Sequence, residues 1–360
     1  MNIISPINQL GYGVTGLNIV KALRKMQPVS LWPIGQPQVT NEEDSFVVRD
    51  SINNSHLFEE DDPCIRIWHQ HDMAQFVGRG TKIGFPIFEL DQFSAIERHH
   101  LNSVDRLFVC SQWAKEVCIE NGIKPKQATI HDDAIDVIPL GVDIEIFKPC
   151  DIKPGPTIFF NCGKWEVRKG HDILVEIFNK AFTEDDDVEL WMMCSNPFLS
   201  EQEDNEWKKK YAYSNLGHKV KFINRVDTQY EVYNIMAQVD CGIFPSKAEG
   251  WNLEALELMS CGKHVIITNY SAHTEFCNKE NSLLIDMSQM EKAYDGKWFN
   301  GKVGSWSHIG EDQIDQAVNH MRKIHNLKKE NVLQKNIEGV STAEKFTWEN
   351  TAKEILNHVS

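Results

Sequence analysis

Residues 157–182, with the sequence TIFFNCGKWEVRKGHDILVEIFNKAF, decide the fold that we expect for the chain. An apolar run at 157–162 is followed by a loop at 163–169 and by an amphipathic pattern at 172–182. A short continuous apolar run is typical of a strand buried on both faces, and apolar residues at helical spacing indicate a helix that covers a sheet. The stretch therefore predicts one strand–loop–helix unit of a parallel sheet.

The alternation of strands and helices continues on both sides of this stretch. We expect further strands at residues 2–7, 65–69, 82–88, 106–110, 188–194, 220–223, 241–244 and 263–268. We expect further helices at residues 17–25, 113–121, 230–238, 253–260, from 311 onward and at 346–359. The pattern breaks near residues 149–156 and restarts, which predicts an α/β protein with two doubly wound, Rossmann-like domains. We place them at 1–150 and 151–345, with a terminal helix at 346–360 that could pack on either domain.

The length and charge of the chain limit its function class. At 360 residues and 41.4 kDa, the chain exceeds what one hydrophobic core usually supports, which agrees with two domains. The formal net charge is −15, and both halves are acidic. Proteins that coat nucleic acid or bind membranes through a basic surface usually have the opposite balance. Both functions are therefore disfavoured, although a local basic cleft is compatible with this charge.

The termini and cysteines predict a cytoplasmic protein. Residues 1–6 lack the basic segment that opens a secretory signal, and no long apolar segment follows. No apolar run is long enough to span a bilayer. The nine cysteines form no C-x-x-C pair, and several lie in apolar runs, where a free thiol behaves as a small hydrophobic group. Such usage suits a reducing compartment.

A glycine motif follows the first expected strand. In doubly wound sheets ligands bind at the carboxyl ends of the strands. A ligand site formed by both domains would therefore lie in a cleft between them. Alternatively, the two domains are independent and share no cleft. Residues 11–16, GYGVTG, fit the G-x-G-x-x-G pattern, whose glycines let the backbone approach a phosphate. A dinucleotide site also needs a carboxylate about 20 residues later. Residues 30–36 contain none, so an NAD site is disfavoured. A loop close to a phosphate and a simple tight turn both remain as interpretations.

Three cations gather in the loop that follows the strand at 157–162. Lys164, Arg168 and Lys169 stand where a parallel sheet would present them to a ligand. A cationic loop there suits a pyrophosphate and the charge that develops on it as it leaves. The alternative is a solvated basic loop without a ligand.

The stretch 244–257, FPSKAEGWNLEALE, predicts a strand end, a loop and a helix start. Glu249 falls in the loop and could accept hydrogen bonds from sugar hydroxyls, and Glu257 falls in the helix and could hold a ribose. The backbone N–H groups between them could point at a phosphate. Alternatively, these acids are favoured only by the helix dipole, which would explain Glu254 better than Glu249.

Glu249 and Glu257 have the spacing of an E-x7-E signature, and the stretch resembles that of retaining, GT-B-fold glycosyltransferases of family 4, the glycosyl transferases of group 1. Similar motifs follow the family's order at residues 11–16, 137–149, 163–170, 259–266 and 346–349. Lys164 stands where the family usually has Arg. The resemblance spans essentially the whole chain. It implies two Rossmann-like domains facing a central cleft and a C-terminal helix that crosses back to the first domain.

The resemblance also implies a set of site residues. The catalytic group would be Lys169, Glu249, Lys164 and Glu89. The donor would be held by Gly13, Val14, Thr15, Gly163, Arg168, Val226, Gly250, Trp251, Asn252, Leu253 and Glu257, and His71 would lie on the acceptor side. We expect no cofactor and no bound metal. Enzymes of this fold generally need no metal, and His69, His71 and Asp72 fall short of a full ligand set.

We therefore predict a retaining, metal-independent glycosyltransferase. It would move a hexose from a nucleotide-diphosphate sugar of the UDP-glucose or GDP-mannose class to a hydroxyl of a glycan, lipid-linked or small-molecule acceptor. One alternative is a catalytically silent nucleotide-sugar-binding protein, and another is a nucleotide-sugar epimerase. A DNA-modifying glycosyltransferase of the same fold would need a local basic patch, for which Arg66, Arg79 and Lys82 are the candidates.

Overall fold

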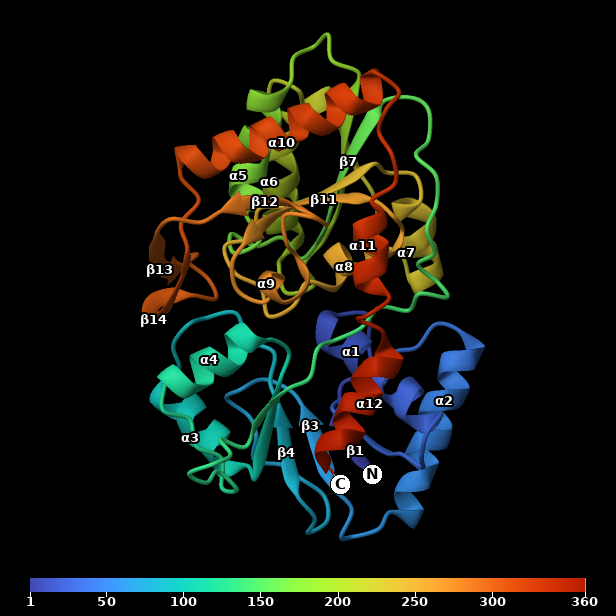
Figure 1. Cartoon of the computed structure of the whole chain (residues 1–360), viewed down its shortest axis with the longest axis vertical. Helices are drawn as coiled ribbons and strands as arrows, with labels where there is room; N and C mark the ends of the chain where they lie inside the picture. The colour runs from blue at the N-terminus through green and yellow to red at the C-terminus, as the bar shows by residue number, and fades with distance from the viewer. Residues whose placement is uncertain (360) are drawn as a thin grey trace. The chain divides into compact units, whose positions relative to one another are not determined.

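The computed structural model describes residues 1–359 and divides into two compact units. Unit 1 comprises Met1–Gly141 together with the segment from Phe346 onward, and unit 2 comprises Val142–Lys345. Figure 1 labels their helices and strands. Each unit is built on its own six-stranded parallel sheet, so the predicted α/β class with two Rossmann-like sheets is confirmed.

Unit 1 has the strand order β2-β1-β3-β4-β5-β6, with every pair parallel. Its strands are β1 (Asn2–Ser5), β2 (Ser30–Pro33), β3 (Cys64–Ile67), β4 (Lys82–Phe85), β5 (Arg106–Val109) and β6 (Ile135–Val137). Its helices are α1 (Gly11–Arg24), α2 (Glu42–Asn53), the 3-10 turn η1 (Asn54–Leu57), α3 (Ala95–Ser103), α4 (Gln112–Glu120) and α12 (Trp348–Val359). The terminal helix α12 packs against α1, and the Thr351 hydroxyl donates to the Pro139 carbonyl at 2.8 Å (Figure 1).

Unit 2 has the strand order β12-β11-β10-β7-β8-β9, again all parallel. Its sheet contains β7 (Thr157–Gly163), β8 (Val188–Cys194), β9 (Val220–Phe222), β10 (Cys241–Phe244), β11 (His264–Asn269) and β12 (Leu283–Asp286). Its helices are α5 (His171–Ala181), α6 (Glu201–Ala212), η2 (Gly217–Lys219), α7 (Gln229–Met236), α8 (Leu253–Ser260), α9 (His273–Phe276), α10 (Glu311–Lys329) and α11 (Ile337–Ala343). A separate antiparallel hairpin is formed by β13 (Met290–Tyr294) and β14 (Asn300–Ser307).

Both sheets place a pair of loops at a topological switch point. In unit 2 the chain starts at β7, runs outward through β8 and β9, and then returns to the other side of β7 through β10. The loops after β7 and β10 therefore diverge and leave a crevice at the carboxyl ends of these strands, which is where ligands bind in such sheets. In unit 1 the loops after β1 and β3 flank the corresponding point.

The predicted glycine loop at residues 11–16 was wrong, because α1 already begins at Gly11. The preceding turn at 6–10 forms the connection instead, with Asn8 Oδ1 accepting from the Leu10 N–H at 2.9 Å. A Cβ at Gly13 would lie 2.3 Å from Asn8 Oδ1, and one at Gly16 would lie 2.0 Å from Ser5 Oγ. These two glycines thus let the first turns of α1 approach the end of β1, which is a packing requirement.

Two glycines of unit 2 allow a controlled test of close backbone approach. Gly170 and Gly262 share a φ of +73°, but a Cβ at Gly170 would lie 2.0 Å from the Pro245 carbonyl oxygen, whereas the nearest atom to one at Gly262 is 3.5 Å away. We expect Gly262→Ala to lower the free energy of unfolding by about 1–2 kcal/mol through backbone strain. Gly170→Ala should cost about 1–3 kcal/mol more, because the loop after β7 must move away from β10.

Urea denaturation of the two variants and the parent protein measures this difference. Equal losses of stability in the two variants would contradict the close approach of the two loops.

Candidate functional site

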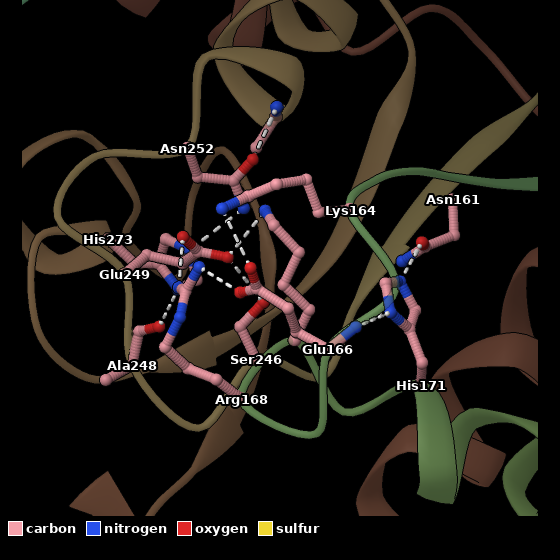
Figure 2. Close-up of polar contacts among 12 residues, drawn as sticks. Asn161, Lys164, Glu166, Arg168, His171, Ser246, Ala248, Glu249, Asn252 and His273 are labelled. Carbon is pink, nitrogen blue, oxygen red and sulfur yellow. Dashed lines mark hydrogen bonds and ion pairs between the residues drawn. The ribbon is translucent and has the colours of Figure 1, made fainter. Parts of the chain in front are cut away.

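The loops after β7 and β10 are joined by a buried ion-pair cluster (Figure 2). The Arg168 guanidinium lies at its centre and donates to Glu166 Oε2, Glu249 Oε2 and the Ala248 carbonyl, each at 2.7 Å. Its side chain is only 4% exposed, and those of Glu166 and Glu249 are 6% exposed. A charge this deeply buried is stable only when it is paired and hydrogen-bonded. Arg168 therefore fixes the two loops at a set distance from each other.

Glu249 is held at both its side chain and its backbone. Its Oε1 accepts from Lys169 Nζ at 2.9 Å and from Ser246 Oγ at 3.0 Å, and its N–H donates to Ser271 Oγ at 2.9 Å. Burial by itself raises the pKa of Glu249, but the charges of Arg168 and Lys169 more than offset that and hold the pKa well below its usual range. Glu249 is thus a fixed carboxylate and a very weak base.

Lys164 is the accessible cation of the cluster. Its ammonium group lies 2.8 Å from Glu166 Oε1, and its side chain is 37% exposed, against 10% for Lys169. Burial lowers the pKa of Lys169, but Glu249 more than reverses this shift, so Lys169 stays protonated. The expected open cationic loop is therefore a paired cluster, in which Glu166 and Glu249 face the three cations.

A polar network under the loop after β7 determines its course. His171 Nδ1 accepts from the Glu166 N–H at 3.1 Å, so its Nε2 carries the hydrogen and donates to Asn161 Oδ1 at 2.9 Å. The amide of Asn161 donates in turn to the Ile243 carbonyl at 2.6 Å, which links β7 to β10. Burial lowers the pKa of His171 to about 3, so this histidine is a neutral structural group. Trp165, 1% exposed, stacks on Trp207 and anchors the middle of the loop.

The start of α8 is strained and buried. Its N-cap Asn252 adopts the left-handed conformation, with φ +88°, and its Oδ1 accepts from the Ala255 N–H at 3.2 Å. Asn252 Nδ2 donates to Nε2 of the buried His273 at 3.0 Å, because Nδ1 of that histidine donates to the Thr268 carbonyl. Residues that keep an unfavourable backbone conformation in this way cluster at functional sites. The predicted donor residues Gly250 and Trp251 are buried in the same turn, and Leu253 is half-buried.

Glu257 lies on a helix whose last six residues are all buried. Burial, together with the charge of Glu254, raises the pKa of Glu257 to about 8. Its carboxyl is therefore largely protonated at neutral pH in this structure. Glu254 also raises the pKa of Lys169, so it acts on the cluster as well as on Glu257.

The remaining donor-side residues lie on the loops around this cluster. Gly163 ends β7 with φ +132°, and a Cβ there would lie 3.1 Å from the Lys169 side chain. Val226 is half-buried in the loop after β9, next to the exposed Arg225. The structure thus brings Lys164, Arg168, Lys169 and Glu249 together and places Gly163 against Lys169.

In unit 1 the predicted residues gather around Tyr12, which the sequence analysis did not single out. The Tyr12 hydroxyl donates to the Ile87 carbonyl at 2.7 Å and accepts from the Ile87 N–H at 3.0 Å. Its ring meets His69 at 4.8 Å, and His69 stacks on His71 at 5.2 Å. Burial, with a smaller contribution from Glu89, raises the pKa of Tyr12. One aromatic side chain therefore connects the start of α1 to the loops after β3 and β4.

The other predicted residues of unit 1 lie at the start of α1. Gly13 is buried and Val14 is half-buried. Thr15 is 1% exposed, and within residues 1–359 its hydroxyl has no hydrogen-bond partner.

The basic patch considered for DNA binding is not formed. Arg66 is 2% exposed and pairs with Asp72 at 2.8 Å, so it is part of the interior. Arg79 is exposed but pairs with Asp61 at 2.7 Å. In the described part of the chain, no three His, Cys, Asp or Glu side chains lie together in a way that could hold a metal ion. Within residues 1–359, no helix has the length and apolarity needed to cross a membrane.

Comparison with known proteins gives a family match within unit 2. Residues 155–295 match the family model described as glycosyl transferases, group 1. This match covers less than half of the chain. A GDP-mannose-dependent α-(1-6)-phosphatidylinositol dimannoside mannosyltransferase of Mycobacterium tuberculosis is 23% identical over 158 residues. That match spans 41% of this chain and 39% of the mycobacterial protein.

Solved structures match over nearly the whole length of the chain. HepE of Anabaena in complex with UDP-glucose is 16% identical, with a TM-score of 0.68 over 99% of this chain and 98% of HepE. The sucrose-phosphate synthase of Thermosynechococcus elongatus is also 16% identical, with a TM-score of 0.68 over 99% of this chain and 97% of that one. At this identity the likeness defines the fold, and that fold is the GT-B architecture expected from the motifs.

Several residues of the site were missed from sequence. Glu166 and Ser246 stand beside the predicted cations and carboxylate, but neither forms part of a spacing that could mark it. His171 follows Gly170 at the start of α5, and Ser271 lies in the turn after β11. Their roles depend on strand order, which brings β10 beside β7, and no local pattern encodes that.

The raised pKa of Glu257 predicts a pH dependence of stability. Between about pH 4.5 and pH 8 the folded chain keeps a proton that the unfolded chain has released. This group therefore lowers the free energy of unfolding by about 1.4 kcal/mol per pH unit as the pH rises, and the loss levels off above pH 8. Glu257→Gln cannot titrate, so its stability relative to the parent protein should rise with pH over that interval.

Urea denaturation at pH 5, 7 and 9 measures the effect. Glu254→Gln serves as a matched variant, because removing that charge should lower the pKa of Glu257 and move the plateau to a lower pH. A stability difference between Glu257→Gln and the parent that does not change with pH would mean that Glu257 is ionised throughout.

Proposed function

We propose that the protein is a retaining glycosyltransferase that transfers a hexose from a nucleotide-diphosphate sugar to a hydroxyl acceptor. The observation that carries this proposal is the cluster of Lys164, Arg168, Lys169 and Glu249 at the switch point of unit 2, beside the start of α8. This crevice combines cations, a fixed carboxylate and a helix N-terminus, which together suit a diphosphate linked to a sugar. The group 1 domain at residues 155–295 supports the same reaction class.

A diphosphate would bind at cations that already have carboxylate partners within the protein. In the structure Lys164 is paired with Glu166 and Lys169 with Glu249. A diphosphate oxygen that reached Lys164 or Lys169 would share that cation with its carboxylate partner. No unpaired ammonium group would therefore have to lose its hydration before the ligand binds. The N–H groups at the start of α8 would add hydrogen bonds without adding charge.

Two carboxyl groups would bind the sugar-nucleotide itself. Arg168, Lys169 and Ser246 occupy three of about four acceptor positions on Glu249, which leaves about one for a sugar hydroxyl. Glu257 would hold the ribose, as its position in the E-x7-E spacing suggests. Unit 1 would supply the acceptor-side groups, with His71 and Glu89 as the candidates.

The chemistry would need no protein nucleophile. The bond between the anomeric carbon and the diphosphate oxygen breaks, and the acceptor oxygen forms a bond to the same face of that carbon. The acceptor proton passes to the departing diphosphate, which leaves as the nucleoside diphosphate. Glu249 is unsuited to take this proton, because its pKa is held well below the usual range. The contribution of the protein would be to stabilise the charge on the leaving group and to align the reactants.

The names of similar proteins support two classes of donor. The mycobacterial relative is GDP-mannose-dependent, and HepE was crystallised with UDP-glucose. We propose that the donor belongs to one of these classes and that catalysis requires no bound metal. Thermal-shift measurements with UDP, GDP and ADP sugars would identify the base, because a ligand at about 100 times its Kd stabilises the folded chain by about 2.7 kcal/mol.

With the donor known, Lys169→Ala and Glu249→Ala should each lower kcat by about 100-fold or more, because each removes part of the charge stabilisation of the leaving group or the positioning of the sugar. Each substitution also leaves a buried charge without one partner, so we expect a loss of stability of about 3–5 kcal/mol. Assays should therefore be run well below the melting temperature of each variant.

Lys180→Ala is the matched control, since Lys180 lies on α5 in the same unit and pairs with Glu311 and Asp315 at the surface. Near-normal transfer by both site variants at a temperature where they are folded would reject the site.

The stereochemistry gives a separate test. Because both bonds form and break on one face of the anomeric carbon, we expect the glycoside to keep the anomeric configuration of the donor. NMR of the purified glycoside measures the configuration through the one-bond coupling constant between the anomeric carbon and its hydrogen. An inverted product would contradict same-face attack and leave the donor-binding assignment standing.

A further inference from the structure

The hairpin β13–β14 is attached firmly to the loop that carries Glu249. Glu291 on β13 accepts from Lys247 Nζ at 2.6 Å, from Trp306 Nε1 at 2.9 Å and from His308 Nδ1 at 2.8 Å. On β14, the Ser307 N–H and hydroxyl both donate to the Lys247 carbonyl, at 3.0 and 2.5 Å. Lys247 precedes Glu249 by two residues, so the base of the hairpin has a fixed position beside the site.

The tip of the hairpin is also ordered by its own hydrogen bonds. Asp295 Oδ1 accepts from the N–H groups of Lys297, Trp298 and Phe299 at 2.7–2.8 Å. Lys297 Nζ reaches Glu203 at the start of α6 at 2.5 Å, which attaches the tip to the body of unit 2. The tip is therefore a built loop that holds Trp298 in one place.

Trp298 and Phe198 form an exposed aromatic pair next to the cationic cluster. Their ring centroids are 6.1 Å apart in an edge-to-face arrangement, although Trp298 is 48% exposed and Phe198 is 57% exposed. Lys164 Nζ lies 5.7 Å from the Phe198 ring, and Lys297 Nζ lies 5.4 Å from the Trp298 ring. The aromatic surface is thus continuous with the accessible cation of the candidate site.

We propose that Trp298 and Phe198 form a saccharide-binding subsite for the acceptor on unit 2. The proposal rests on the proposed function, and it adds the class of acceptor: a hydroxyl compound that contains a pyranose ring. A pyranose has an apolar face of C–H groups and a rim of hydroxyls, so it matches an exposed ring bordered by charged side chains. Here the ring of Trp298 lies beside Lys297, which pairs with Glu203, and the ring of Phe198 lies beside Lys164.

The location of the subsite favours the acceptor over the nucleotide. The family match ends at residue 295, so Trp298 lies beyond the segment that this chain shares with the family model, whereas Phe198 lies within it, and it is the location of Trp298 that favours the acceptor. Residues that bind the donor are expected within the segment that matches the family model. Residues that bind the acceptor, which varies between such enzymes, are expected outside that segment. Base stacking on the same rings is the competing occupant, and the experiment separates the two.

Binding is measured first, without turnover. Saturation-transfer NMR with the full chain should detect methyl α-D-glucopyranoside or methyl α-D-mannopyranoside, and Trp298→Ala should weaken that binding about tenfold or more. Trp298→Phe keeps an aromatic face and should recover most of the affinity. Tyr213→Ala is the matched control, because Tyr213 is an 82% exposed aromatic residue at the end of α6. It should leave binding unchanged.

The affinity for UDP and GDP is measured on the same variants. Unchanged nucleotide affinity in Trp298→Ala, together with weaker glycoside binding, supports the acceptor subsite. Weaker nucleotide binding would assign the rings to the base and overturn the proposal. It would also be overturned if the parent protein bound neither glycoside, or if Trp298→Ala bound both as well as the parent does.

Turnover distinguishes this proposal from the proposed function. If the parent protein transfers a hexose to these glycosides, Trp298→Ala should raise their KM about tenfold with little change in kcat, because the ring lies away from the reacting bond. Glycoside binding that depends on Trp298, in a protein that turns over no nucleotide sugar, would reject the transferase and keep the subsite.

Discussion

The ion pairs of Arg168 with Glu166 and Glu249 are the interaction on which the rest of unit 2 depends. The pair with Glu249 joins the loops after β7 and β10, which diverge at the switch point of the sheet, and the pair with Glu166 holds Arg168 within its own loop. The Lys169–Glu249 pair and the Lys247 N–H to Arg168 carbonyl bond add to this connection. A buried charge network of this kind adds little net stability compared with apolar packing, but it fixes geometry, because breaking any one pair is costly. The network therefore keeps the two loops in fixed positions. Glu166 and Glu249 serve as the counter-ions of its cations within the protein.

Internal pairing also reconciles the site with the acidity of the chain. A net charge of −15 argues against an open cationic surface, and the structure contains none here, since Glu166, Glu249 and the nearby Glu254 offset the three cations. A small dianion would share Lys164 or Lys169 with the carboxylate partner of that cation, so its binding would need no open cationic surface. A long polyanion would need many exposed cations, and Arg66 and Arg79 are paired within the chain.

The sequence was sufficient for the fold class and for most of the central strands. The predicted bounds of β8, β10 and α8 agree with the structure to the residue, because these largely buried elements leave little freedom in composition. The sequence-based prediction was wrong where one pattern suits two different structures. The glycines at 13 and 16 suit a phosphate loop and equally a helix packed closely on a strand, and the second is what occurs.

The sequence predicted which residues the candidate site contains, but it did not predict the contacts among them. Spacing identified Lys164, Lys169 and Glu249, since these lie on loops at strand ends. It could not identify Glu166 as the partner of Lys164, nor the contacts of Tyr12 with Ile87 or of Glu291 with Lys247. A local motif records which side chains are near a loop, whereas the pairing of charges depends on which loops become neighbours.

The left-handed conformations of Asn252 and Ser271 suggest how this protein would respond to stabilisation. Neither residue is glycine, and each is held by hydrogen bonds that also position the loop of Glu249. Such strain is a local loss of stability that selection for foldedness alone would remove. A search for thermostable variants that ignored activity would therefore be expected to accumulate glycines at these two positions and to loosen the loop as it did so. At these two positions, the fixed geometry of the Glu249 loop is therefore maintained at the expense of the stability of the fold.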